Sequence, residues 1–134
     1  MFALHAFITS DQDAYPLASL EAALSKLLAG QDADAPEVSF STLPFSNQPR
    51  LLYRWPTWNF SVTSDQGEQV ASDADFVAQT CRAVFPGGRP THRIRVVFAQ
   101  DSSRDFTNHI IWIMDWLKEI PNVVLYDETS KALC

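Results

Sequence analysis

The amino-acid sequence predicts an α+β domain, with a mixed, mostly antiparallel sheet of about five strands and three helices packed on it. Two observations support this fold class. Residues 91–127 alternate strand, helix and strand patterns, and the earlier part of the chain intersperses short alternating strands with two helical stripes. With 134 residues the chain fits one domain, residues 1–134. The expected element order is β-α-β-β-α-β-α-β.

The N-terminal third predicts a strand, a helix and a second strand. Residues 2–9 are rich in Phe, Leu and Ile, which favours a buried strand. Pro16 suits the first turn of a helix, and Gly30 is a natural end for it. Apolar residues recur between them at helical spacing: Leu17, Leu20, Leu24 and Leu27. Residues 38–42 then alternate apolar and polar side chains, which predicts the second strand.

Two further strands are predicted on either side of Pro56, at residues 50–55 and 58–63. Proline cannot donate a hydrogen bond to a sheet ladder, so it marks an edge, a bulge or a break. The Pro56-Thr57 pair is not a favoured two-residue hairpin turn. We therefore expect one bent strand, or two separate strands, in preference to a tight hairpin.

The next predicted elements are a turn and a helix. Residues 64–67 have the composition of a turn. Ser72 and Asp75 stand at the spacing of a capping box, which predicts that a helix begins there. The glycines and prolines of residues 86–90 end that helix.

The C-terminal third carries the clearest pattern in the chain. Residues 92–98 alternate as a strand, and the polar residues 102–105 offer N-caps for a helix. That helix has an apolar stripe formed by Phe106, Ile110, Ile113, Leu117 and Ile120. Residues 123–126 form a closing strand. We expect this strand-helix-strand unit to be parallel, with a right-handed crossover.

Charge and composition narrow the classes of partner. The formal net charge is −6, which argues against nonspecific nucleic-acid binding, because that binding depends on Lys and Arg. Residues 1–37 carry six acids against one lysine, and this excess would steer a basic protein partner. No apolar run approaches the roughly 20 residues of a membrane span. Without a basic n-region at its start, the chain is expected to be cytoplasmic and to have no membrane partner.

No motif for catalysis, metal binding or cofactor binding is recognisable. His5, His92 and His109 lack the spacings of metal ligands, and the chain has no nucleophile elbow. The two cysteines, Cys81 and Cys134, give no disulfide framework. We therefore expect no metal, no cofactor and no enzymatic activity.

Aromatic residues are the remaining signal. Tryptophan is enriched at the energetic centres of protein interfaces. The candidate contacts for a partner are Trp55, Trp58 and Trp116, surrounded by the acids Asp65, Glu68, Asp115 and Glu119. Such a cluster would form an apolar anchor with a negative rim. The pattern leaves open whether Trp112, four residues before Trp116, belongs to the core or to the interface.

The chain resembles the small cytoplasmic immunity proteins that bacteria pair with secreted or contact-delivered toxins. The resemblance lies in size, acidic balance, element order and the closing runs 93–98, 110–117 and 123–127. It implies a tight one-to-one complex with a cognate toxin or effector domain, which the immunity protein neutralises by occluding its active site or locking its conformation. It further implies that the toxin acts in the cytoplasm.

Two functions from other classes stay open. One is a small enzyme whose site is assembled from scattered residues such as His5, Arg95, Asp101 and Asp127. A concave pocket with two converging titratable groups of shifted pKa would favour it. The other is an adapter or chaperone that loads a secreted effector, which stoichiometry and client release would reveal.

Overall fold

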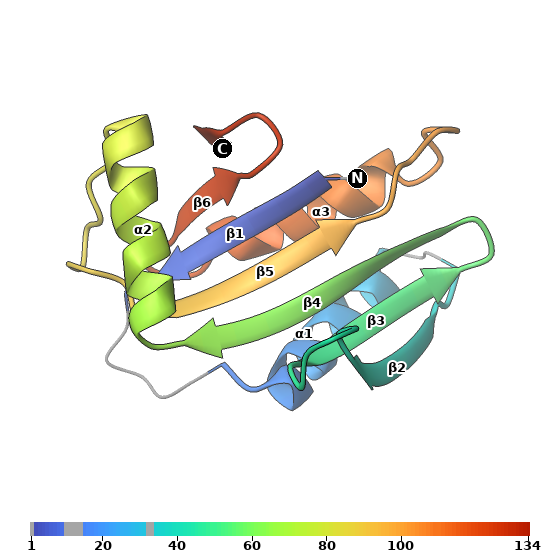
Figure 1. The fold of residues 1–134 in the computed structure, drawn as a ribbon. Coiled ribbons are helices and arrows are strands. Elements are labelled where there is room, and N and C mark those ends of the chain that lie inside the picture. The colour runs from blue at the N-terminus through green and yellow to red at the C-terminus, as the bar shows by residue number, and fades with distance from the viewer. Residues whose placement is uncertain (1, 10–14, 32–33) are drawn as a thin grey trace.

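The computed structural model of the protein describes residues 2–9, 15–31 and 34–134. Over these residues the chain forms an α+β fold with three helices and seven strands (Figure 1). The elements are β1 (Phe2–Ile8), α1 (Leu17–Gly30), β2 (Glu37–Thr42), β3 (Pro49–Trp55), β4 (Trp58–Gln66), α2 (Glu68–Cys81), β5 (His92–Phe98), α3 (Thr107–Lys118), β6 (Val124–Asp127) and β7 (Ala132–Leu133).

All seven strands belong to one sheet in the order β2-β3-β4-β5-β1-β6-β7, and every neighbouring pair is antiparallel. The predicted α+β class is confirmed, but the expected mixed sheet of about five strands is wrong in detail. β5 and β6 run in the same direction, as the strand-helix-strand pattern predicted. They are not neighbours, because β1 lies between them and pairs with both.

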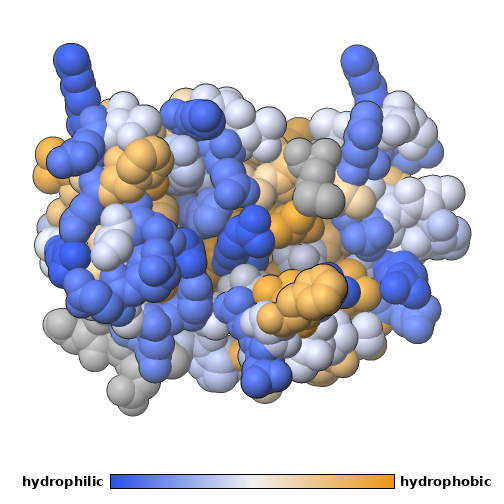
Figure 2. Space-filling model, viewed as in Figure 1, coloured by the Kyte–Doolittle hydropathy of each residue, from blue (hydrophilic) through white to orange (hydrophobic). Residues whose placement is uncertain are grey.

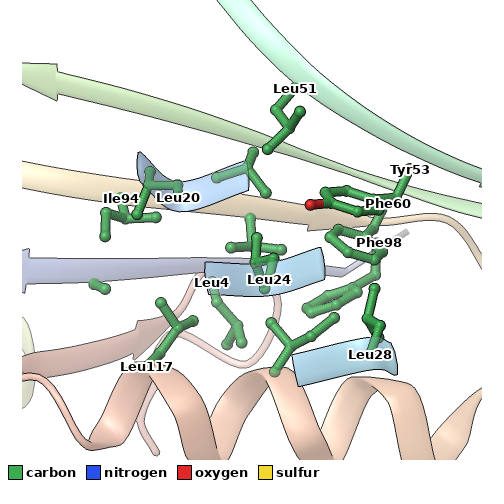
Figure 3. Packing of buried hydrophobic residues seen from close by; sticks show 14 of the residues in the cluster. Leu4, Leu20, Leu24, Leu28, Leu51, Tyr53, Phe60, Ile94, Phe98 and Leu117 are labelled. Carbon is green, nitrogen blue, oxygen red and sulfur yellow. The ribbon is translucent and has the colours of Figure 1, made fainter. Parts of the chain in front are cut away.

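The helices cover the two faces of the sheet unequally. Figure 1 shows α1 and α3 behind the sheet, and α2 crossing in front of one end of β4, β5 and β1. The main core lies between the sheet and the two rear helices. Figure 3 shows leucines of α1, among them Leu20, Leu24 and Leu28, packing against strand residues and Leu117 of α3. A smaller core, with Phe7 and Tyr126 from the sheet and Val70, Ala74 and Val77 from α2, lies on the front face.

Side-chain alternation decides which residues enter each core. On β5, Ile94, Val96 and Phe98 are fully buried on the rear face. Arg93 and Arg95 occupy the alternate positions and point to the front. The front face beyond α2 has no helix over it (Figure 1), and Figure 2 shows apolar patches there between hydrophilic side chains.

The junction at Pro56 is a tight hairpin, which corrects the expectation of a bent strand or separate strands. Trp55 pairs directly with Trp58, so Pro56 and Thr57 alone form the turn. Neither has a positive φ, whereas the favoured type I′ hairpin turn needs positive φ at both positions. The two indoles anchor this turn instead. Trp55 Nε1 donates to the Asp34 carbonyl at 2.8 Å, and Trp58 Nε1 donates to the Ala99 carbonyl at 2.8 Å.

Helix α2 begins at Glu68, four residues before the predicted capping box. The predicted turn at residues 64–67 is also wrong, because β4 continues to Gln66 and Gly67 alone makes the corner with a φ of 113°. Asp75 caps no backbone amide; its carboxylate accepts two hydrogen bonds from Arg89. The acid that the local pattern assigned to a cap thus binds Arg89, 14 residues further along the chain.

The C-terminal residues form the short strand β7, which the sequence pattern did not reveal. Cys134 N donates to the Leu125 carbonyl at 3.0 Å, which ties the end of the chain to β6. Across residues 2–9, 15–31 and 34–134, no helix combines the length and the apolar character that crossing a membrane requires.

Candidate functional site

Two of the predicted contact residues belong to the core. The exposed fractions of Trp55 and Trp58 are 5% and 3%, and both indole N–H groups are already bonded to backbone carbonyls. Their rings stack among aromatic neighbours, with Trp58 and Phe106 centroids 4.8 Å apart. The premise that these indoles lie on the exterior is therefore wrong. Trp58 is closed to a partner, and only an edge of the Trp55 ring is open, at a surface cavity.

The predicted contacts on α3 remain at the surface. Asp115 and Glu119 are exposed, and Trp116 is half-buried against the main core. Trp112, whose position the sequence left open, is likewise half-buried and contacts the core. Ile111, beside these residues on the outer side of the helix, is 47% exposed. This flank of α3 therefore presents apolar side chains and two acids at the surface, and its role in binding a partner stays a prediction.

The two remaining acids belong to a different surface. Asp65 at the end of β4 accepts two hydrogen bonds from Arg93, at 3.1 and 2.6 Å, and Asp73 of α2 accepts a third at 2.6 Å. Glu68 pairs with Arg89 at 3.2 Å. These acids neutralise arginines on the α2 side of the sheet, whereas Asp115 and Glu119 lie on the helix behind it (Figure 1). The structure therefore does not assemble a single tryptophan cluster with an acidic rim.

The edge strand β2 is a second exposed feature that the sequence analysis did not identify. Its only neighbour in the described sheet is β3. Five of its six residues are exposed, including Val38 at 36% and Phe40 at 58%. Phe45, in the turn that follows, is fully exposed. The surrounding sequence, Leu43-Pro44-Phe45-Ser46, could have signalled this, because an aromatic residue beside a loop proline has little core to enter.

The outward backbone groups of β2 can be assigned from the β2–β3 hairpin. Leu43 N donates to the Gln48 carbonyl at 3.0 Å, so these opposed residues form a hydrogen-bonded pair. Because such pairs alternate along an antiparallel ladder, Ser39 and Ser41 also bond to β3. The N–H and C=O groups of Val38, Phe40 and Thr42 therefore point away from the sheet, toward the free edge.

A cleft of about 310 Å³ lies between α2 and the sheet, with His5 in it. Neither ring nitrogen of His5 has a hydrogen-bond partner among the described residues, and Glu128 Oε2 lies 3.7 Å from Nε2. Burial, helped by the charge of Arg93, lowers the pKa of His5. Burial also raises the pKa of Tyr126, which lines the same cleft. The cleft thus holds two titratable groups whose neutral forms are favoured.

The proposed enzyme residues are only partly brought together. His5 and Arg95 are directly paired across β1 and β5, and Glu128 reaches both. Asp101 instead accepts the Phe106 N–H at the start of α3. Asp127 accepts hydrogen bonds from its own turn, at Thr129 and Ser130. His5 and Arg95 are therefore the only two of the four that the described structure brings together, and of these only His5 lines the cleft.

The part of the chain that the structure describes contains no group of three or more His, Cys, Asp or Glu side chains placed to hold a metal ion. Comparison of the chain with profiles of known protein families, with curated proteins and with solved structures gives no match.

Proposed function

We propose that the protein is a binding protein of the immunity type, which neutralises a cognate toxin acting in the cytoplasm. The observation that carries the proposal is the free edge of β2. It combines backbone donors and acceptors that have no partner strand among the described residues with exposed apolar side chains. These are the two requirements for adding a strand from another chain.

Natural sheets usually protect such an edge. Common devices are a very short strand, an inward charge, a lysine, a proline or a bulge. The opposite edge follows this rule, because β7 has only two residues. Glu37–Thr42 is six residues long and contains neither lysine nor proline. Glu37 is its one charged residue, and Val38 and Phe40 are exposed beyond it. An edge of this length with two exposed apolar side chains favours a partner that covers it.

The mode of neutralisation follows from this geometry. A toxin segment that pairs with β2 would be held in an extended conformation along its whole backbone. If that segment borders the toxin's active site, the bound domain would occlude the site with a one-to-one stoichiometry. Apolar contacts from Val38, Phe40 and Phe45 would supply the slow dissociation that neutralisation requires.

The test uses a purified toxin domain as the candidate partner, chosen from a toxin-like reading frame where one adjoins this gene. We expect a one-to-one complex with a Kd below about 1 nM and rescue of cells that express the toxin. Phe40→Lys should weaken the complex at least a hundredfold, because it places a charge in the apolar contact. Val38→Pro removes an outward N–H and leaves the β3 ladder intact, so it should weaken binding about tenfold.

The matched control lies on α3. The double variant Asp115→Lys, Glu119→Lys changes the acidic flank that the sequence first suggested. If this variant abolishes binding while Phe40→Lys leaves it unchanged, the partner uses α3 and the edge-strand proposal is wrong. A Kd near 1 μM or weaker for the native pair would remove the toxin-neutralising function itself. An oligomeric complex that releases its client would point to an adapter or chaperone.

A small enzyme is the second candidate, and the His5 cleft is the observation that favours it. Neutral His5 could act as a base, and Arg95 could hold an anionic substrate. However, Arg93 is already neutralised by Asp65 and Asp73, and the His5 ring nitrogens are inaccessible to solvent. A thermal-shift screen of small anions separates the two functions: a stabilising ligand that His5→Gln and Arg95→Gln both lose would favour the enzyme.

A further inference from the structure

A cavity of about 510 Å³ lies at the end of the β3–β4 hairpin, where α3 begins. It is separate from the His5 cleft and from the exposed flank of α3. The residues that line it are Asp34, Ala35, Trp55, Pro56, Thr57, Asp105, Phe106 and His109. Ala35 lies two residues before β2, so the cavity adjoins the free edge of the sheet.

The inner wall of the cavity is aromatic. The His109 ring lies 5.2 Å from the Trp55 ring and 5.0 Å from the Phe106 ring, measured between centroids. Trp55 and Phe106 are themselves 5.6 Å apart. This wall is preorganised by packing, since Trp55 is 5% exposed and its indole N–H is fixed to the Asp34 carbonyl. It offers an apolar surface to an alkyl chain.

The rim of the cavity is acidic and carries no compensating cation. Asp34 and Asp105 are exposed, and no Lys or Arg is among the lining residues. No hydrogen bond or ion pair within the described residues engages either carboxylate, in contrast to Asp65 and Asp73 on the other face. Burial lowers the pKa of His109, so the ring is neutral at pH 7 and does not repel a positive group.

Polar groups behind the cavity wall add negative charge to this region. Neither ring nitrogen of His109 has a partner among the described residues, and Asp101 Oδ1, behind the lining, has none either. Asp101 and Asp34 both act on His109 electrostatically, which places their negative charge near the ring. The His109 ring nitrogens and Asp101 Oδ1 are closed to solvent, so they make no direct contact with a ligand in the cavity. The negative charge of Asp34 and Asp105 at the rim, with Asp101 near the ring, favours a cation over an anion.

We propose that this cavity binds a basic side chain, lysine or arginine, of the protein partner, an inference that rests on the proposed function. The alkyl stem would lie against Phe106 and the edge of Trp55, and the charged head would lie between Asp34 and Asp105. The chain's net charge of −6 would attract such a group over longer distances. A strand paired with β2 would bring its flanking residues to this cavity.

The test uses NMR titration with Nα-acetyl-arginine amide, and Nα-acetyl-citrulline amide as the uncharged control of the same shape. We expect millimolar binding of the arginine compound, with the largest shift at the Trp55 indole N–H, which reports on the Asp34 carbonyl. The Trp58 indole, bonded to Ala99, should stay unchanged. Equal shifts with the citrulline compound would overturn the proposal, because charge would then play no part.

Variants locate the site. Asp34→Asn and Asp105→Asn should each weaken the arginine compound about two- to fivefold, as expected for exposed ion pairs. Asp115→Asn, an exposed acid on the outer side of α3, should have no effect. Equal losses for all three variants would mean general electrostatic attraction and contradict a built site. Agmatine binding a hundredfold more tightly than the blocked arginine would assign the cavity to a free amine instead.

Failure of the cavity proposal can be distinguished from failure of the proposed immunity function. If the toxin binds and the arginine compound does not, the cavity proposal alone fails. If the arginine compound binds but no toxin complex forms, the immunity function fails and the cavity remains a cation site. Where both hold, the double variant Asp34→Asn, Asp105→Asn should weaken the toxin complex about tenfold.

Discussion

His5 on β1 and His109 on α3 lie beside different cavities, and the difference between their surroundings separates two kinds of polar site. Both rings have unpartnered nitrogens among the described residues, and burial lowers the pKa of both. His5 lies on the α2 side of the sheet, beside the Arg93 and Arg95 guanidinium groups. His109 lies at the hairpin end, in a cluster of aromatic rings.

Charges near His5 satisfy one another. Arg93 is 9% exposed and is held by two carboxylates, and Arg95 pairs with Glu128. Near His109 the aromatic rings are packed, but the charges are not paired. Asp34 and Asp105 have no partner among the described residues. The charges of the first region are thus paired within the fold. Those of the second region have no partner among the described residues, which is what the proposed cation site requires.

The largest expected effect on stability comes from the aromatic cluster at the β3–β4 hairpin. Trp58→Ala should lower the free energy of unfolding by about 3–5 kcal/mol, because it removes a 3% exposed indole from between Phe60, Phe98 and Phe106. Urea unfolding at pH 7.5 measures the change. Trp116→Ala is the matched control, and its half-buried ring should cost less than half as much. Equal costs would mean that α3, not the hairpin, holds this end together.

Substitution in the charged region around Arg93 should lower the free energy of unfolding by less. Further substitutions should restore part of that loss. Arg93→Met should cost about 2–3 kcal/mol, because it removes hydrogen bonds to charged groups and leaves Asp65 and Asp73 close together without a cation. Both carboxylates are partly exposed, so water replaces some of the lost interaction.

The triple variant Arg93→Met, Asp65→Asn, Asp73→Asn tests this reason. It should recover at least half of the loss, because no unpaired charge remains. A triple variant as unstable as Arg93→Met alone would show that the arginine's own contacts, such as the guanidinium carbon 5.9 Å from the centre of the Phe7 ring, matter more than the unpaired carboxylates.

The sequence predicted the fold where local pattern and tertiary structure agree. His92–Phe98 alternates so regularly that the predicted and observed strands coincide, and α1 ends at the predicted Gly30. The hairpin at Pro56 could not be predicted from its turn residues. Its determinants are the Asp34 and Ala99 carbonyls, which lie 21 and 41 residues from the indoles they bind. The start of α2 was missed for the same reason, because Asp75 serves a distant arginine.

The site was less predictable than the fold, although one signal was present. Trp55 is in phase with Leu51 and Tyr53 on β3, and strand parity alone places it in the core. Exposure of the β2 edge depends on the order of the strands in the sheet, which alternation does not specify. The cavity beside His109 joins Asp34, the hairpin and α3, so no single segment reveals it.

The smallest expected effect is on the pH dependence of stability, which compares His5 and His109 directly. The ordinary pKa of histidine is 6.5, and both folded values are lower. As pH falls below 6.5, the unfolded chain therefore binds protons that the folded chain does not, and stability decreases until the folded pKa values are passed. His5→Gln and His109→Gln should each reduce the stability lost between pH 7.5 and pH 5.0.

Glu128→Gln sharpens this comparison. The Glu128 carboxylate raises the pKa of His5 against the opposing effect of burial, so removing it should lower that pKa further. Stability should then fall more steeply with acid, and the additional slope should vanish in the double variant with His5→Gln but persist with His109→Gln. Unfolding at four pH values measures these slopes. If His109→Gln also abolished the additional slope, the two regions would be electrostatically coupled, and their separation into a structural half and a ligand-binding half would be wrong.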